Sequence, residues 1–552
     1  MVPVSATDDL PRPGRTRPDL SRLGLPRPGR AAGLRAALLA ADFTADGLLE
    51  LLGAPAYAAL ARGETVPAER ATRWPPGGTP PASATLTRLF LLQHAVPRAH
   101  AEAVLPLAAC LADGWLRADG EAVRAVVDVR PYGGPAGQDW WIVSDLGCAV
   151  GGAAGAAAGA YGDGAPGAYG DGASGNGAPP AAGTTPAAGL VLGVGGASTT
   201  LAGLTVPLDG GRVLDLGTGS GIQALHAGAR ADAVTATDVN PRALACARLT
   251  LALSGARDAD LRAGSLFEPV AGERYDLIVS NPPFVISPAA RLTYRDGGMA
   301  GDELCRTLVR EAADHLADGG YCQLLANWQH VEDEDWRERV AGWVPPGCDA
   351  WIVQREVQDV TQYAELWLRD AGDHADRAAY AARYDDWLDA FAAARTRAVG
   401  FGWITLRRTD AADPAVTVED WPHAVEQPLG EAVVEHFARQ DFLRRNDDAA
   451  LLATTFRLAD DVVQEQVGRP GEEDPEHVVL RRQRGMLRAQ RADTVAAGFA
   501  GACDGTLPAG VILDAIAQVL EEDPAALRER TPGVIRLLVE QGFLAPVQAA
   551  PS

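Results

Sequence analysis

Two short segments carry the side chains best suited to chemistry. The first runs from Val213 to Ile222 and reads Val-Leu-Asp-Leu-Gly-Thr-Gly-Ser-Gly-Ile. Its apolar start predicts a buried strand, and its glycines predict a tight turn whose backbone can approach a ligand closely. The second runs from Tyr275 to Phe284 and ends in Asn-Pro-Pro-Phe. The amide and carbonyl groups of that ending are suited to binding a planar NH2 group.

The first segment has the spacing Asp-x-Gly-x-Gly-x-Gly, from Asp215 to Gly221. On its own this spacing fits a dinucleotide, whose pyrophosphate would meet the helix N-terminus. It also fits S-adenosylmethionine (SAM), whose ammonium group can donate to Asp215. Asp238 favours such a ligand, because an acidic side chain at the end of the next strand can accept hydrogen bonds from both ribose hydroxyls. Asn240 and Pro241 also fit an ordinary helix start, and both roles can hold at once.

The second segment predicts the reaction. The nitrogen of an amide or aromatic amine is a poor nucleophile because its lone pair is delocalised. Asn281 offers a side-chain carbonyl and Pro282 a backbone carbonyl to hold the two N–H bonds, while Phe284 offers a flat face for stacking. A nitrogen held in this way can be directed at the methyl group of SAM. Alone the motif would be a turn, but its place after a further buried strand favours methyl transfer to nitrogen.

The elements that must position these residues alternate between strand and helix from residue 190 to 410. This alternation predicts right-handed βαβ units in a doubly wound α/β sheet. Predicted strands lie at 212–216, 233–239, 261–263, 275–280, 321–327, 350–357 and 401–407. Predicted helices lie at 222–229, 241–254, 302–316, 334–343, 361–369 and 376–395. Before the first strand, Ser198–Thr200 predicts either a helix that covers the cofactor or an ordinary helix cap.

The N-terminal part of the chain predicts an arm and a small domain. Residues 1–30 are rich in arginine and proline and are expected to form a disordered arm. Residues 31–147 show the apolar periodicity of short helices, one of them over Ala103–Leu111. They finish in two strand-like runs, Val123–Val129 and Trp140–Val143. Helices followed by a β-ribbon predict a winged-helix-like α+β domain that holds a substrate or partner.

A linker and a C-terminal domain complete the predicted organisation. Residues 148–189 are almost all Gly, Ala, Pro and Asp, which predicts a flexible Gly/Ala-rich linker. Residues 411–552 form a separate unit with helices predicted at Gly510–Leu520 and Gly533–Gln541, followed by a closing strand. This pattern suggests a second winged-helix-like domain or, with about equal weight, a helical cap on the catalytic domain.

Composition restricts the classes of function. The net charge of −23 means that the chain as a whole repels phosphate backbones. None of the seven cysteines forms a Cys-x-x-Cys pair, which argues for reduced thiols in a cytoplasm and against a zinc site. The nine histidines show no His-Glu-x-x-His motif, so metal hydrolysis is unsupported. We see no apolar run long enough to span a membrane and no apolar signal core.

These motifs resemble the class I SAM-dependent N-methyltransferases that carry an Asn-Pro-Pro-(Phe/Tyr) motif. The resemblance covers roughly 190–345 and concerns two groups, the release-factor glutamine N5-methyltransferases and the small-domain enzymes that methylate guanine N2 of ribosomal RNA. Tyr294–Asp302 is similar to the Gly-Gly-x-x-Gly stretch of the glutamine enzymes, whereas Ser280–Phe284 matches the Ser-Asn-Pro-Pro-Phe form of the RNA enzymes. The resemblance implies a Rossmann-like methyltransferase sheet of seven strands.

The resemblance also implies a set of site residues. Asn281, Pro282 and Phe284 are expected to hold the substrate amide at the catalytic site. The residues expected to bind SAM are Asp215, Gly217, Thr218, Gly219, Gly221, Asp238, Ser265, Leu266 and Asn281. Ser265 stands where many SAM enzymes have Asp, and Phe284 stands where the glutamine enzymes usually have Tyr.

Three functions remain open from the sequence. The favoured one is SAM-dependent methylation of a glutamine side chain in a protein, because the chain is acidic and Gly297-Gly298 fits that group. The second is methylation of an exocyclic amine of RNA or DNA, at guanine N2 or adenine N6. The third is a SAM-binding regulatory protein without catalysis, against which the intact Asn-Pro-Pro-Phe counts. All three imply a macromolecular partner and neither a metal nor a membrane.

Overall fold

The structure is a computed structural model that describes residues 23–75, 77–147, 189–288, 299–370, 377–470 and 477–547. The chain divides into two compact units, Met1–Pro422 and His423–Ser552. The predicted linker lies outside the described residues except for Gly189, and so does the predicted arm except for residues 23–30.

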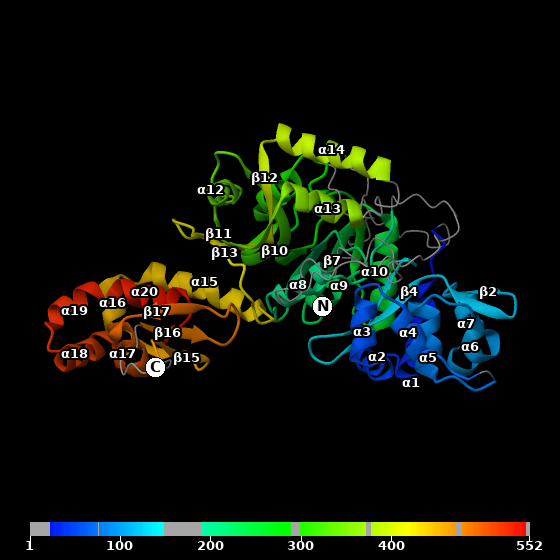
Figure 1. The fold of residues 1–552 in the computed structure, drawn as a ribbon, viewed down its shortest axis with the longest axis horizontal. Helices are drawn as coiled ribbons and strands as arrows, with labels where there is room; N and C mark the ends of the chain where they lie inside the picture. The colour runs from blue at the N-terminus through cyan, green and yellow to red at the C-terminus, as the bar shows by residue number, and fades with distance from the viewer. Residues whose placement is uncertain are drawn as a thin grey trace, which may run out of the picture. The chain divides into compact units, whose positions relative to one another are not determined.

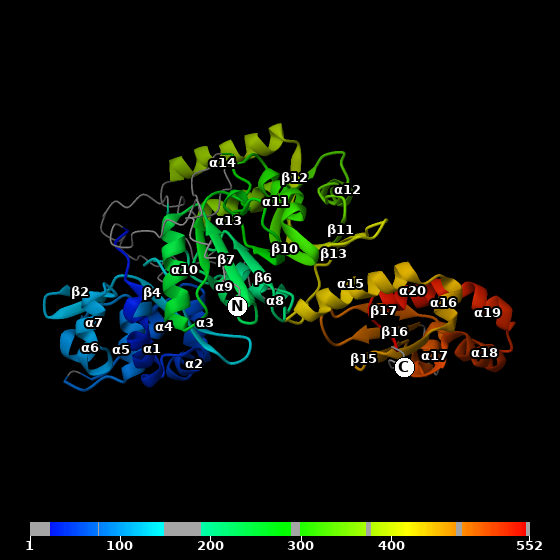
Figure 2. The same ribbon diagram turned by 180° about the vertical axis from the view of Figure 1, so that it is seen from behind.

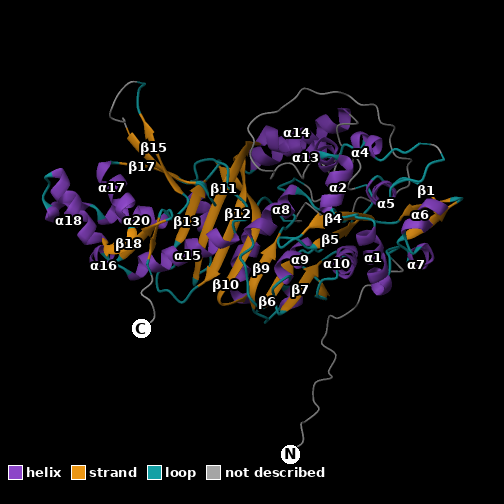
Figure 3. Ribbon diagram, turned by 90° about the horizontal axis from the view of Figure 1, so that it is seen from below, coloured by secondary structure: helices purple, strands orange, loops and turns teal. Residues whose placement is uncertain are grey.

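An eight-stranded mixed sheet forms the centre of the first unit (Figures 1 and 3). Its strands follow the order β13-β11-β12-β10-β9-β6-β7-β8. Their bounds are β6 Arg212–Leu216, β7 Ala233–Asp238, β8 Asp260–Ala263, β9 Tyr275–Ser280, β10 Leu316–Val331, β11 Cys348–Asp359, β12 Thr396–Arg408 and β13 Val416–Asp420. The first seven correspond to the predicted strands. The predicted number of strands was one too few, because β13 lies beyond the expected boundary at residue 410 and pairs in parallel with β11.

Five neighbouring strands of this sheet run parallel, from β8 through β7, β6 and β9 to β10. β12 runs antiparallel to both β10 and β11. The strand order reverses between β6 and β9, which makes a doubly wound, Rossmann-like α/β fold as predicted. The helices of this region are α8 Gly196–Leu204, α9 Ile222–Gly228, α10 Pro241–Ser254, α11 Glu303–Ala312, α12 Trp336–Ala341, α13 Val360–Asp370 and α14 Arg377–Ala393.

Residues 23–147 form short helices and two small sheets, as expected. The helices are α1 Ala31–Ala40, α2 Ala45–Leu52, α3 Ala54–Ala61, α4 Val66–Ala71, α5 Ala82–Leu86, α6 Arg98–Val104 and α7 Leu107–Ala112. The strands are β1 Val96–Pro97, β2 Leu116–Asp119, β3 Ala122–Ala125, β4 Asp128–Gly133 and β5 Asp139–Ser144. From α5 to β3 the elements follow the order helix, strand, helix, helix, strand, strand, and the antiparallel sheet has the order β1-β3-β2. This order is the one expected of a winged helix, and the winged-helix-like assignment stays a prediction.

Two details of the N-terminal prediction were wrong. The helix predicted over Ala103–Leu111 is two helices, because Leu105 has extended backbone and Pro106 follows it. The end of the predicted arm is ordered, since Leu25 is buried and the Arg27 backbone N–H donates to the Asp113 carbonyl at 2.8 Å. Apolar contact and a backbone hydrogen bond therefore hold the chain in place well before residue 31.

Helix α10 joins the N-terminal part to the central sheet (Figure 2). Its residues Ala243, Cys246 and Leu249 belong to the same buried cluster as the N-terminal helices. Two of its hydroxyls accept from β5, Thr250 Oγ1 from the Val143 N–H at 2.9 Å and Ser254 Oγ from the Trp141 N–H at 3.0 Å. The two regions therefore share one hydrophobic core and a set of buried hydrogen bonds.

The second unit is described by itself. Its helices are α15 Gly430–Arg445, α16 Asp448–Ala453, α17 Thr494–Ala502, α18 Ala509–Leu520, α19 Pro524–Arg530 and α20 Pro532–Glu540. One sheet has the order β15-β16-β17, with strands at Val462–Val467, His477–Arg482 and Ala489–Ala492. The other has the order β18-β14-β19, with strands at Asp504–Pro508, Thr455–Leu458 and Leu544–Pro546. The closing strand was predicted, but it pairs with β14 from the start of the unit and forms no hairpin with β18.

Two further findings concern the part of the chain that the structure describes. No helix within it combines the length and the apolar character that crossing a membrane requires. Six cysteines lie within it, and each is buried with a free thiol.

We expect Thr250→Val to lower the free energy of unfolding by about 1–3 kcal/mol, the cost of leaving the buried Val143 N–H without an acceptor. Urea denaturation followed by circular dichroism measures the change. Thr199→Val is the matched control, because the Thr199 hydroxyl is exposed and donates only within its own helix. Equal stability of the two variants would show that the Thr250 hydroxyl does not support the junction.

Candidate active site

Four predicted site segments follow four parallel strands and meet at one edge of the sheet. Leu216 at the end of β6 pairs with Thr237 of β7 and with Ser280 of β9, and Asp238 pairs with Ala263 at the end of β8. The carboxyl ends of parallel strands beside a reversal of strand order form the usual ligand crevice of such sheets. The structure thus brings the two segments of the sequence analysis together.

The glycine turn leaves open space on one side of its backbone. Gly217, Gly219 and Gly221 have φ values of +77°, +54° and +87°, a region that residues with a Cβ rarely adopt. A Cβ on Gly217 or Gly219 would meet no atom within 4 Å, whereas a Cβ on Gly221 would lie 2.9 Å from Ala247 Cα. The first two glycines therefore leave room for a ligand, and the third allows α9 to pack on α10.

Asp215 is buried at the end of β6 with one oxygen satisfied and one free. Its Oδ2 accepts from the Thr218 hydroxyl at 2.6 Å and from the Ala224 N–H at 2.9 Å. Its Oδ1 is buried and has no hydrogen-bond partner among the described residues. Burial, together with the nearby charge of Asp238, raises the pKa of Asp215 to about 7, although both hydrogen bonds oppose the shift. A cationic donor beside Oδ1 would satisfy this oxygen and favour its charged form.

Asp238 lies on the other side of the glycine turn. Its Oδ2 accepts from the Gly219 N–H at 3.0 Å and its Oδ1 from the Asn240 N–H at 2.8 Å. Burial raises the pKa of Asp238, and backbone N–H groups partly offset the shift. A carboxylate has about four acceptor sites, so Asp238 keeps capacity for an external hydroxyl. Asn240 caps α10 by accepting from the Arg242 N–H at 3.0 Å, so a helix start and an acceptor for a ligand occur side by side.

Ser265 and Leu266 follow β8 at the same edge. The Gly264 N–H donates to the Asp238 carbonyl at 3.1 Å, which keeps this turn against β7. Ser265 is exposed, and Leu266 is partly buried with a φ of +48°. Both residues are therefore near Asp238, where the sequence placed them.

The Asn-Pro-Pro-Phe residues leave the end of β9 as a loop. The Ser280 hydroxyl donates to the Leu216 carbonyl at 2.8 Å, which ties the start of the loop to β6. Asn281 Nδ2 donates to Ser198 Oγ at 3.4 Å, and this leaves Asn281 Oδ1 as the acceptor. Pro282 is buried and Phe284 is half-buried against the central core. We call residues Asn281–Ile286 the acceptor loop.

Helix α8 brings a second layer of polar groups to this loop. Gln223 Nε2, on the first turn of α9, donates to the Ser198 carbonyl at 2.8 Å. At the other end of α8, Gln323 on β10 accepts from the Val206 N–H at 2.8 Å and donates to the Leu204 carbonyl at 2.7 Å. The sequence suggested Ser198 only as part of a covering helix or a cap. Gln223 and Gln323 were missed, because their partners lie at least 25 residues away along the chain.

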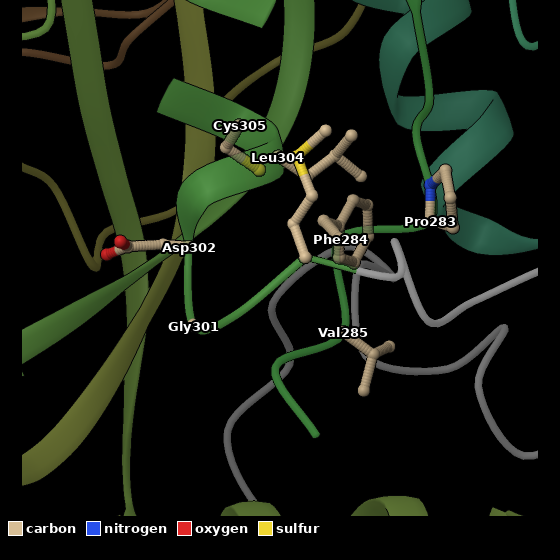
Figure 4. Close-up of a pocket in the computed structure, with 8 residues that line it drawn as sticks. Pro283, Phe284, Val285, Gly301, Asp302, Leu304 and Cys305 are labelled. Atoms are coloured by element: carbon tan, nitrogen blue, oxygen red, sulfur yellow. The ribbon is translucent and has the colours of Figure 1, made fainter. Parts of the chain in front are cut away.

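A shallow pocket lies between the acceptor loop and the start of α11 (Figure 4). The residues that line it are Pro283, Phe284, Val285, Met299, Gly301, Asp302, Leu304 and Cys305. The Asp302 carboxylate points away from the other labelled side chains in Figure 4. It accepts instead from Arg339 and from the Gln329 N–H at 2.8 Å. Of the predicted Tyr294–Asp302 stretch, residues 294–298 lie outside the described residues.

The polar groups at this edge fit a ligand that has a cationic amino-acid part and a nucleoside part. The free Asp215 Oδ1 suits an ammonium group, the open side of the glycine turn admits the ligand backbone, and the Asp238 lone pairs suit a ribose. The described ranges contain no group of three or more His, Cys, Asp or Glu side chains placed to hold a metal ion.

Comparisons with known proteins agree with this geometry. Residues 195–333 match the family described as Methyltransferase small domain. Residues 40–126 and 434–546 each match a family described as a domain of unknown function. The chain therefore carries a methyltransferase small domain between two separate sequence families.

Three relatives show what the central segment is similar to. Ribosomal RNA small subunit methyltransferase C of Salmonella arizonae is 36% identical over 134 residues, which cover 24% of this chain and 35% of the relative. Ribosomal protein uL3 glutamine methyltransferase of Bradyrhizobium diazoefficiens is 34% identical over 147 residues, 24% of this chain and 46% of the relative. Release factor glutamine methyltransferase of Deinococcus radiodurans is 38% identical over 146 residues, 24% and 51% respectively. The chain thus spans about half or less of the length of these relatives.

The raised pKa of Asp215 predicts a pH-dependent stability. The unfolded carboxyl loses its proton near pH 4 and the folded one near pH 7, so its contribution to folding is complete below pH 4 and is lost as pH rises to 7. The loss is up to about 4 kcal/mol, since one pKa unit corresponds to about 1.4 kcal/mol. The prediction compares the melting temperature of ligand-free Asp215→Asn with that of the ligand-free wild type. We expect the variant's advantage in melting temperature to be larger at pH 8 than at pH 5. Asp276→Asn is the control, because Asp276 lies at the opposite edge, where it accepts from the Arg212 N–H. If the melting temperatures of Asp215→Asn and the wild type differed by the same amount at both pH values, the raised pKa of Asp215 would be contradicted.

Proposed function

We propose that this protein is a SAM-dependent N-methyltransferase that acts on a planar NH2 group. The observation that carries the proposal is the meeting of three features at adjacent strand ends: the glycine turn with a free Asp215 oxygen, Asp238 on the next strand, and the Asn-Pro-Pro-Phe loop after β9. The match to the methyltransferase small domain family supports it.

The residues at the edge of β6, β7 and β8 would hold the cofactor. Asp215 Oδ1 accepts from the ammonium group, Asp238 accepts from the ribose hydroxyls, and Ser265 and Leu266 lie where the adenine is expected. The open side of Gly217 and Gly219 admits the amino-acid portion, and Thr218 fixes the Asp215 carboxylate between them. When bound, SAM supplies an electrophilic methyl group on a sulfonium.

The acceptor loop would hold the substrate nitrogen. Asn281 Oδ1 and the Pro282 carbonyl each accept one N–H of the substrate, and the Phe284 ring stacks on its planar group. The two prolines restrict the loop, so little conformational entropy is lost when the substrate binds. No general base is required, because the methylated nitrogen is acidic and water can remove its proton.

The substrate we favour is a glutamine side chain of a protein. The net charge of −23 opposes association with a polyanion. The loop itself is neutral, which suits an uncharged amide. Relatives described as glutamine methyltransferases of a ribosomal protein and of release factors match the same segment.

An RNA exocyclic amine is the second candidate. Ser280–Phe284 reads Ser-Asn-Pro-Pro-Phe, the form used by guanine-N2 enzymes. A relative described as a ribosomal RNA methyltransferase matches the same segment with 36% identity. The winged-helix arrangement between α5 and β3 would then serve as a separate surface for the nucleic acid.

The deciding experiment transfers labelled methyl from SAM into an extract of cells that lack this protein. Protease and nuclease digestion then show which polymer holds the label. Label in protein, recovered after acid hydrolysis as methylamine, supports the favoured substrate. Label in RNA replaces it with the second candidate, and no label in either polymer refutes the proposed function.

We expect Asp238→Ala to weaken binding of S-adenosylhomocysteine by about 1–3 kcal/mol, the range for hydrogen bonds left unmade. Isothermal titration calorimetry on the folded variant measures the loss. Asp232→Ala is the matched control, because Asp232 lies before β7 at the opposite edge and also accepts a backbone N–H, that of Gly211 at 2.9 Å. If Asp238→Ala bound the ligand like the control, Asp238 would not be the ribose acceptor.

We expect Asn281→Ala to reduce methyl transfer by roughly 100-fold or more, the scale seen when one preorganised polar group is removed. Binding of S-adenosylhomocysteine should change little, because Asn281 is one expected cofactor residue among several and the others are unchanged. Phe284→Tyr is the companion variant, since it keeps the stacking face and should retain most of the activity. An Asn281→Ala enzyme as active as the wild type would refute the proposed role of the loop.

A further inference from the structure

The acceptor loop is tied to the sheet at its start but needs a second attachment. Ser280 and the two prolines fix the first residues, whereas Phe284 lies four residues beyond Ser280. Beyond Phe284, Val285 and Ile286 are buried, with 6% and 4% of their surface exposed. The Ile286 N–H donates to the Tyr363 hydroxyl at 2.9 Å, two residues after the stacking ring.

Tyr363 connects this end of the loop to the sheet. It lies on α13 and is fully buried. Its hydroxyl also accepts from Asn327 Nδ2 at 3.1 Å. Asn327 is fully buried on β10, three residues after Leu324, which pairs with Ser280 at the end of β9. One hydroxyl therefore holds the far end of the loop at the same strand edge from which the loop departs.

The Tyr363 ring is held on several sides. Four aromatic rings surround it with centroid distances of 5.5–6.0 Å, those of Trp367, Trp387, Phe391 and Phe401. Phe401 stands directly opposite Asn327 on the neighbouring strand. Burial raises the pKa of Tyr363 above its ordinary range, so the hydroxyl stays neutral. A ring packed in this way has little freedom to move its oxygen.

We propose that Tyr363 is a positioning residue of the methyl-transfer site, which sets the place of Phe284 by anchoring the acceptor loop at Ile286. The inference rests on the proposed function. Tyr363 touches neither cofactor nor substrate, and its effect passes through the loop. Removal of the hydroxyl leaves the Ile286 N–H free to move and lets Phe284 shift relative to Asn281.

The test compares full-length wild type, Tyr363→Phe and Tyr384→Phe. Tyr384 is the matched control, because it lies on the neighbouring α14 and its exposed hydroxyl donates only to the Thr361 carbonyl at 3.1 Å. Affinity for S-adenosylhomocysteine is measured by calorimetry. Initial rates of labelled methyl transfer into the extract of cells lacking the protein are measured at several SAM concentrations and extract dilutions.

We expect Tyr363→Phe to bind S-adenosylhomocysteine like the wild type and to keep its KM for SAM. Its kcat should fall on the order of 100-fold, the scale of a small misplacement of a reacting group. Tyr384→Phe should match the wild type in every measurement. A general loss of structure would lower cofactor affinity as well, so this split separates positioning from folding.

Other outcomes decide against the proposal. Wild-type kcat in a folded Tyr363→Phe protein overturns it while leaving the proposed function intact. A wild type that labels neither protein nor RNA overturns both. If Tyr363→Phe does not fold, Asn327→Ala takes its place, because it detaches the hydroxyl from β10 and should lower kcat with cofactor affinity retained. Wild-type kcat in that variant overturns the proposal equally.

Discussion

Helix α10 packs against other parts of the protein on two sides, and this constraint shapes the first unit. One side packs on the central sheet and the other belongs to the N-terminal core, so ten of its fourteen residues are buried. Asn240 caps the start of α10 two residues after Asp238, and Ala247 lies against Gly221 of the glycine turn. A helix held on two sides gives these polar groups a fixed frame. The small residues of α10 are what allow both cores to approach it so closely.

Charged groups and neutral groups lie in different parts of the proposed site. A buried carboxylate at the end of β6 and a half-buried one at the end of β7 face the expected position of a cationic cofactor, and backbone N–H groups hold each of them in place. The acceptor loop offers only neutral acceptors and a ring. Methyl transfer to an amide nitrogen depends on the orientation of its lone pair toward the methyl group. The rigidity of the loop, from prolines at one end and a buried hydroxyl at the other, meets that need.

The sequence predicted correctly those helices and strands that short residue patterns define. The strands at 212–216 and 275–280 and the helix at 241–254 have the predicted bounds, because apolar runs and an Asn-Pro start define them. The strand β13 was missed because it is short and mostly half-exposed at a sheet edge. The expected cofactor residues, which stay a prediction, were proposed from spacing, since one turn supplies most of them. Gln223, Gln323 and Tyr363 were not, because their roles depend on partners that only the folded chain brings near.

Under the proposed function, the unsatisfied Asp215 oxygen has a consequence for how tightly the product binds. S-adenosylhomocysteine keeps the ammonium group of SAM and lacks only the methyl group and, with it, the sulfonium charge. A carboxylate that contacts the ammonium therefore strengthens the binding of product and of substrate cofactor alike. Such a residue lowers the concentration at which the enzyme is half-saturated but gives no preference for SAM over its product. Inhibition by accumulated product is then the cost of this mode of binding, and removal of S-adenosylhomocysteine by the cell would set the working rate.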